Sequence, residues 1–211
     1  MQDPGSGGLL PDIAARLKKF SPRLAPDRHQ RRRSAVVMLL RESPVDGIEV
    51  LMIERAQRAG DPWSGHMGFP GGRVDPGDAH SFAAALRECV EEIGLDLARH
   101  GRFLGRLSDL ATHLRSGNSA MLVTPFVFAV TDHPPLAPNY EVADCVWVPL
   151  AFLADNRFRQ SMPWQYDGIE VALPCYYYSQ RRIWGLSLGM LDEMLQVIGL
   201  AEFAPVVPGR P

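Results

Sequence analysis

The chain has 211 residues, of which 46% are hydrophobic and 22% are charged, and its formal net charge is −2. This length and apolar content suffice for one sizeable core, whereas the slight negative charge argues against extended nucleic acid as a partner. No long apolar run opens the chain, so we expect neither a signal peptide nor contact with a membrane, and we place the protein in the cytoplasm.

The cysteines support the same assignment. Cys89, Cys145 and Cys175 lie far apart, are odd in number and match no metal-binding spacing. We therefore expect no disulfide framework, as is usual in a reducing compartment.

The first part of the chain predicts an arm, residues 1–33, followed by two strands. Within the arm, Ile13, Leu17 and Phe20 have the spacing of one face of a short helix. A cluster of arginines then precedes the first strand, and we interpret it as a solvated lead-in, with attraction of phosphate as the alternative. These residues are Arg28, Arg31, Arg32 and Arg33. Apolar strands follow over residues 34–41 and 48–55.

The later part of the chain predicts more strands and one closing helix. The strands are expected over residues 103–110, 121–130, 140–148 and 169–178, and the amphipathic helix over residues 185–198. This mixed order indicates an α+β fold or an α/β/α sandwich. We expect a domain over residues 34–200, followed by a loose Pro-rich tail over residues 201–211.

Residues 72–94 are the most informative stretch, and they predict a loop followed by a helix. A turn at residues 75–78 contains Pro and Gly, Ser81 can serve as N-cap or first-turn residue, and Gly94 suits the helix end. Apolar residues recur at helical spacing and should face the core. They are Phe82, Leu86, Cys89 or Val90, and Ile93.

Three glutamates occupy the last two turns of this predicted helix. Glu88, Glu91 and Glu92 lie at positions i, i+3 and i+4, so they share one face and repel each other. A hard cation relieves such repulsion, and oxygen ligands select Mg²⁺ or Mn²⁺. The plain alternative is a solvated acidic face, but that alternative explains neither the glycine-proline loop nor Gly94.

This stretch resembles the signature of the Nudix hydrolases, G-x5-E-x7-R-E-U-x-E-E-x-G-U, where U is a bulky apolar residue. Gly72 matches the first glycine and residues 87–95 match the closing half, with Cys89 as a loose fit to an apolar position. Two departures are visible. Asp78 stands where glutamate is usual, and eight residues rather than seven separate it from Arg87.

The resemblance implies a mixed sheet between helices and a Mg²⁺- or Mn²⁺-dependent enzyme. Such an enzyme hydrolyses a nucleoside diphosphate linked to another moiety. The resemblance also implies that the backbone carbonyl of Gly72 and the carboxylates of Glu88, Glu91 and Glu92 bind metal, and that Arg87 orients Glu88. Metal-binding carboxylates that are all retained favour an enzyme over the alternative, a non-catalytic Nudix-like ligand sensor.

The general base is left open between the helix and a loop. Glu88 is one candidate, and a loop acid, Glu141 or Asp144, is the other. For Glu141 we also consider, and favour, the ordinary role of a residue that leads into a strand. The oligomeric state is open too, with a homodimer as one alternative.

The flanks of the signature resemble the coenzyme A pyrophosphatase branch of the family. The matching segments are residues 69–72, 74–75, 141–150 and 182–186. They imply coenzyme A or an acyl-CoA as the substrate, with ADP-ribose, nucleotide sugars, dinucleotides or nucleoside triphosphates as alternatives. Residues 61–66 depart from the branch because an arginine is out of register, so Arg55 or Arg58 would have to bind a 3′-phosphate.

Overall fold

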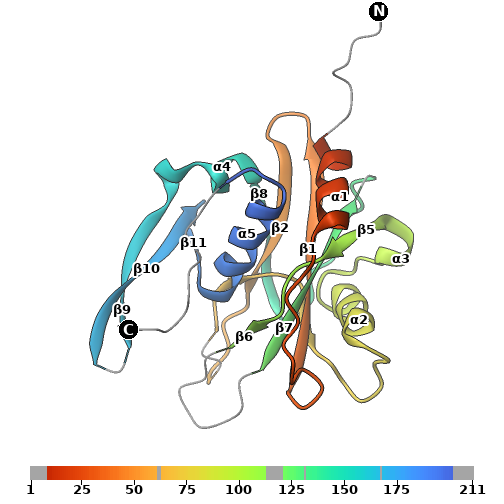
Figure 1. Cartoon of the computed structure of the whole chain (residues 1–211), viewed down its shortest axis with the longest axis horizontal. Coiled ribbons are helices and arrows are strands. Elements are labelled where there is room, and N and C mark those ends of the chain that lie inside the picture. Colours follow the sequence, from red (N-terminus) through yellow and green to blue (C-terminus); the bar gives the residue numbers. More distant parts are fainter. Residues whose placement is uncertain (1–8, 61–62, 113–120, 131, 167, 202–211) are drawn as a thin grey trace, which may run out of the picture.

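The computed structural model describes residues 9–60, 63–112, 121–130, 132–166 and 168–201, and the predicted tail after residue 201 lies outside them (Figure 1). Within the described residues the chain forms a mixed eight-stranded sheet and a three-stranded sheet. The larger sheet contains β1 (Arg33–Ser43), β2 (Gly47–Arg55), β3 (Met67–Gly68), β4 (Gly71–Arg73), β5 (Gly101–Arg106), β6 (Leu110–Ala111), β7 (Leu122–Val130) and β8 (Val142–Pro149). The smaller sheet contains β9 (Gln160–Tyr166), β10 (Ile169–Tyr178) and β11 (Arg181–Trp184).

Five α-helices and one 3₁₀ turn complete the described part of the chain. They are α1 (Leu9–Lys19), α2 (Ser81–Ile93), α3 (Leu97–His100), α4 (Leu150–Ala154), η1 (Asn156–Phe158) and α5 (Gly185–Val197). No helix within the described residues is both long and apolar enough to cross a lipid bilayer.

Strand β1 lies at the centre of the larger sheet. It runs parallel to β7 and antiparallel to β2 and β4, and the strand order is β3-β2-β1-β7-β5, with β8 beside β2 and β6 beside β7. The first half of β1 pairs with β4 and the second half with β2, so both strands lie along the same edge of β1. The short strand β4 is thereby fixed against the middle of the sheet.

The side chains on the two faces of β1 belong to two separate hydrophobic cores. Val36, Met38 and Leu40 pack with apolar residues of α1 and α5 on one face. The alternate residues of β1, among them Val37 and Leu39, pack with α2 on the other face. Helices therefore cover both faces of a mixed sheet, which confirms the α+β class and the α/β/α sandwich. Figure 1 shows the smaller sheet at one side of the molecule, next to α5.

The helix predicted in the N-terminal arm is α1. Its residues Leu10, Ile13 and Leu17 are buried in the same core as α5 and the sheet, so this part of the arm packs onto the domain. The proposed boundary at residue 34 stays a prediction. The three cysteines are free, as expected.

Two predicted strands have different bounds in the structure. The strand expected over residues 103–110 is divided into β5 and β6 because the chain bulges near Gly105 and then turns the Asp109 carboxylate inward. That buried carboxylate accepts hydrogen bonds from Thr124 and Arg106. The strand expected from residue 140 begins at Val142, because residues 140 and 141 form a turn in which the Val142 amide donates to the Asn139 carbonyl, while the Asn139 amide donates to Glu92 at the end of α2.

Candidate active site

The loop before α2 begins with a close contact between β4 and β1. Gly71 has φ of +150°, and a Cβ there would collide with the backbone of Ala35 and Val36. At Gly72 a Cβ would collide with the carboxylate of Glu88. Glycine at both positions therefore lets the strand lie against the sheet and lets Glu88 reach the backbone of the loop.

Helix α2 is capped at both ends by local contacts. His80 is the N-cap, and its Nδ1 accepts a hydrogen bond from the Ala83 amide at 3.1 Å. Ser81 is therefore a buried first-turn residue rather than the cap. Gly94 ends the helix with φ of +70°, as predicted. Of the two residues left open for the core face, Cys89 is buried and Val90 is exposed.

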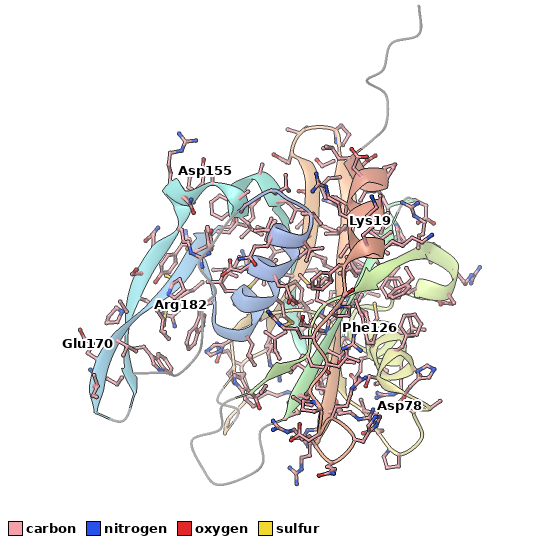
Figure 2. All side chains as sticks on the ribbon, in the orientation of Figure 1. Lys19, Asp78, Phe126, Asp155, Glu170 and Arg182 are labelled. Atoms are coloured by element: carbon pink, nitrogen blue, oxygen red, sulfur yellow. The ribbon has the colours of Figure 1, made fainter. Side chains whose placement is uncertain are left out.

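Arg87 connects the loop to the acidic side of α2. Its Nε and Nη2 donate to the Asp78 carboxylate at 3.1 and 2.9 Å, and its Nη2 also donates to the carbonyl of Arg73. Its Nη1 donates to Glu88 Oε1 and to Glu91 Oε2, each at 3.0 Å. Figure 2 shows Asp78 in the loop below α2. The structure thus brings Arg87 and Glu88 together as the resemblance implied.

Glu92 is the most buried of the three glutamates, at 4% exposure. One carboxylate oxygen accepts a hydrogen bond from the Gly71 amide at 2.8 Å. The pKa of Glu92 is raised to about 7, chiefly by burial and in part by the charges of Glu88 and Glu141, whereas the Gly71 hydrogen bond and Arg55 lower it. Ionisation of a buried carboxylate costs free energy, so a positive charge next to Glu92 would stabilise its ionised form.

The three glutamates do not form one open acidic face, which goes against the less favoured alternative of a solvated face. Burial raises the pKa of Glu88, although Arg87 lowers it, whereas the Glu91 side chain is 53% exposed. Within the described part of the chain, no three Asp, Glu, His or Cys side chains converge closely enough to hold a metal ion. In this arrangement the guanidinium of Arg87 binds both Glu88 and Glu91.

The donor set nevertheless fits a hard divalent cation. All four groups assigned to metal binding offer oxygen, namely three carboxylates and the Gly72 carbonyl. The Gly72 carbonyl accepts a hydrogen bond from Ser34 Oγ at 2.6 Å, and Gly72 pairs with Ala35 in the sheet, so a cation bound here would have to share or displace these contacts. A cation bound here would compete with Arg87 for carboxylate oxygen and would offset the burial of Glu92.

The two loop acids have different surroundings. Glu141 directly precedes β8, and its Oε1 lies 3.2 Å from Nη2 of Arg58. Its charge contributes to the raised pKa of Glu92. Asp144 lies within β8, and its carboxylate is bound by Arg181 at 2.6 Å, an arginine that also holds Glu54 at 2.8 Å. Glu141 is thus the acid whose charge acts on Glu92 of α2.

Sequence reasoning missed two residues that support the site. Asp78 was noted only as a departure from the family pattern, yet it is the two-point partner of Arg87. Ser34, which binds the Gly72 carbonyl, had no local signal because the contact joins residues 38 positions apart. Asp78 could have been found from its place in the signature and from the need of a half-buried arginine for a carboxylate partner.

A model of the NUDIX domain matches residues 30–165 of the chain. The chain belongs to the Nudix family. An uncharacterised protein of Schizosaccharomyces pombe is 34% identical over 154 residues, covering 65% of this chain and 47% of the relative. The uncharacterised Nudix hydrolase NudL of Yersinia pestis is 30% identical over 138 residues, covering 65% of this chain and 66% of the relative. The chain thus spans about half of the first relative and slightly under two thirds of the second.

Solved structures of Nudix proteins are also similar to the chain. A binary complex of the Caenorhabditis elegans Ap4A hydrolase is 19% identical with a TM-score of 0.48, covering 56% of this chain and 80% of the other. The NUDIX domain of Shewanella oneidensis NrtR with ADP ribose is 19% identical with a TM-score of 0.46, covering 64% of this chain and 79% of the other.

Proposed function

We propose that this Nudix protein is a Mg²⁺-dependent pyrophosphohydrolase that cleaves a nucleoside diphosphate linked to another moiety. The observation that supports this proposal most is the pairing of Arg87 with Glu88 beside the buried Glu92. A helix that only needed solubility would gain nothing from burying a carboxylate next to a second one. Mn²⁺ is the alternative cation, since it accepts the same oxygen ligands.

In the proposed site, the backbone carbonyl of Gly72 and the carboxylates of Glu88, Glu91 and Glu92 hold the cation. When bound, the cation neutralises charge on the diphosphate and makes water easier to deprotonate. Arg87 keeps Glu88 against Gly72, because its guanidinium is itself fixed by Asp78.

The reaction is an attack of water on one phosphorus of the pyrophosphate. The new P–O bond forms as the bond from that phosphorus to the bridging oxygen breaks, and the second phosphate leaves with that oxygen. The water proton passes to a carboxylate base. We propose Glu141 as this base, with Glu88 as the alternative. Glu141 is not one of the residues proposed to bind the metal, and its charge acts on Glu92, which is one of them.

For the substrate we propose coenzyme A or an acyl-CoA, which would give 3′,5′-ADP and a 4′-phosphopantetheine. This proposal rests on the flanking segments of the sequence. Arg58, one of two arginines that could bind the 3′-phosphate, already contacts Glu141, and Arg55 acts on the charge of Glu92. ADP-ribose, nucleotide sugars, dinucleotides and nucleoside triphosphates remain the alternatives.

The test compares these substrates at equal concentration, with Mg²⁺, with Mn²⁺ and with EDTA. Mass spectrometry in ¹⁸O-water identifies the products and the phosphorus attacked, and the Glu92→Gln variant serves as the blank. Metal-dependent cleavage of one diphosphate supports the proposal, and faster cleavage of coenzyme A than of dephospho-coenzyme A supports the substrate. Equal rates in wild type and Glu92→Gln would reject the site.

A further inference from the structure

Arg58 forms a second cluster of side chains beside the proposed metal site. Its Nη2 lies 3.2 Å from Glu141 Oε1, and its guanidinium carbon lies 4.9 Å from the centre of the Tyr140 ring. The backbone of Arg58 is fixed as well, because its N–H donates to Ser64 Oγ at 2.9 Å and its carbonyl accepts from the same hydroxyl at 2.8 Å. The backbone of Arg58 is therefore held in place by Ser64, and its side chain extends from this fixed point to Glu141.

The backbone around Glu141 is tied both to this loop and to α2. The Ala56 amide donates to the carbonyl of Glu141 at 2.8 Å, and the Asn139 amide donates to the carbonyl of Glu92 at 2.9 Å. The Glu141 amide in turn donates to Asn139 Oδ1 at 2.7 Å. These bonds set the backbone of Glu141 near the end of α2, but they leave the direction of its side chain free.

We propose that Arg58 is a positioning residue that fixes the carboxylate of Glu141 beside Glu92. This inference rests on the proposed function and deepens it, since it explains how a loop acid is held for proton transfer. The two side chains are 37% and 33% exposed, so the ion pair contributes little to stability. Its effect is geometric, because the planar guanidinium lies between a ring and a carboxylate and offers a fixed set of donors.

The experiment is a mutant cycle with Arg58→Gln, Glu141→Gln and the double variant. We expect Arg58→Gln to lower kcat about tenfold, as expected for a misplaced group, while KM changes less than about twofold. In the Glu141→Gln background the Arg58→Gln change should have no further effect on kcat. Arg58→Lys should recover only part of the loss, because lysine lacks the planar fork.

The matched control is Arg157→Gln, which removes another exposed arginine bound to a neighbouring carboxylate, that of Asp155 at 2.6 Å. This variant should keep wild-type kcat and KM. A rise in KM with unchanged kcat in Arg58→Gln would instead make Arg58 a substrate contact and overturn the proposal. Losses that multiply in the double variant would overturn it as well, since Arg58 would then act without Glu141.

A second readout does not depend on activity. Three-bond couplings that report the χ1 rotamer of Glu141 should become averaged in Arg58→Gln and stay unchanged in Arg157→Gln, because the Arg58 guanidinium contacts the side chain of Glu141 and not its backbone. Unchanged couplings in Arg58→Gln would overturn the proposal. If wild type cleaves no diphosphate of the panel, the proposed function fails, whereas the couplings still decide whether Arg58 holds Glu141.

Discussion

Asp78 accepts two hydrogen bonds from Arg87, from Nε to Oδ1 at 3.1 Å and from Nη2 to Oδ2 at 2.9 Å. The Asp78 carboxylate is itself placed by the amide of Asp75, which donates to Oδ2 at 2.8 Å. An aspartate in the place of the usual glutamate therefore still binds the signature arginine. The departure in the sequence leaves the contact to Glu88 intact.

Asp78→Asn is expected to weaken both stability and turnover. The amide keeps the size of the side chain but presents one oxygen and no charge, and a lost charge-assisted hydrogen bond costs about 1.5–3 kcal/mol. Urea denaturation should show a loss near this size, and kcat should fall because Arg87 is less well held. Asp155→Asn, which also removes a carboxylate bound to an arginine, should change neither, since that pair includes a highly exposed arginine.

Acid should reduce the difference in stability between wild type and Asp78→Asn. The Arg87 hydrogen bond, followed by the Asp75 amide, lowers the pKa of Asp78 below its usual value. A carboxyl whose folded pKa is depressed stabilises the protein above its unfolded pKa of about 3.9, and this contribution is lost as pH falls toward the folded value. The stability difference between wild type and Asp78→Asn should therefore shrink below about pH 4. A constant difference down to pH 2.5 would contradict the linkage.

The sequence predicted the local features of the site better than its long-range contacts. The loop, the helix over residues 81–93 and its end at Gly94 follow from turn residues and helical spacing, which act over a few positions. The burial of Glu92 could not be predicted, because it depends on the approach of Gly71 to β1. The separation of β5 from β6 also escaped prediction, because Asp109 is buried against residues far away in the chain.

Glu92→Gln should lower activity by orders of magnitude without unfolding the protein. The amide oxygen can still accept the Gly71 hydrogen bond, and the variant no longer buries a charge, so its melting temperature should equal or exceed that of wild type. Glu193→Gln is a matched control, because Glu193 also accepts a backbone hydrogen bond, from Ser108 at 2.8 Å, on the other face of the sheet. Glu193→Gln should retain activity, and an active Glu92→Gln at saturating Mg²⁺ would exclude Glu92 from the metal site.

Metal binding to the same residues should stabilise the folded state. A cation that binds only the folded protein adds about 2.7 kcal/mol at a concentration one hundred times its Kd. Mn²⁺ titration should therefore raise the melting temperature of wild type and of Glu193→Gln but not of Glu92→Gln, and EDTA should reverse the shift. An equal shift in all three proteins would place the cation elsewhere.

Arg87→Lys should reduce catalysis more than stability. Lysine keeps the charge but replaces a planar fork with a point charge, so it cannot bind Asp78, Glu88 and Glu91 at the same time. We expect kcat to fall at least tenfold, while urea denaturation shows a loss no larger than that of Asp78→Asn, because lysine keeps a charge that can still bind one of these carboxylates. A variant that loses stability but keeps wild-type kcat would show that Arg87 is only a structural ion-pair partner.

The N-terminal helix should contribute to stability and not to the chemistry. Leu17 is 3% exposed, packs in the core shared by α1 and α5, and lies on the face of the sheet opposite α2. Removing a buried leucine side chain typically costs about 2–5 kcal/mol, so Leu17→Ala should lower the urea midpoint clearly. Leu9→Ala is the matched control, since Leu9 belongs to the same helix but is exposed, and it should have almost no effect. Because no residue of α1 contacts the carboxylates of α2 in the contacts described, the folded fraction of Leu17→Ala should keep wild-type kcat. A fall in kcat at full folding would instead connect the arm to the active site.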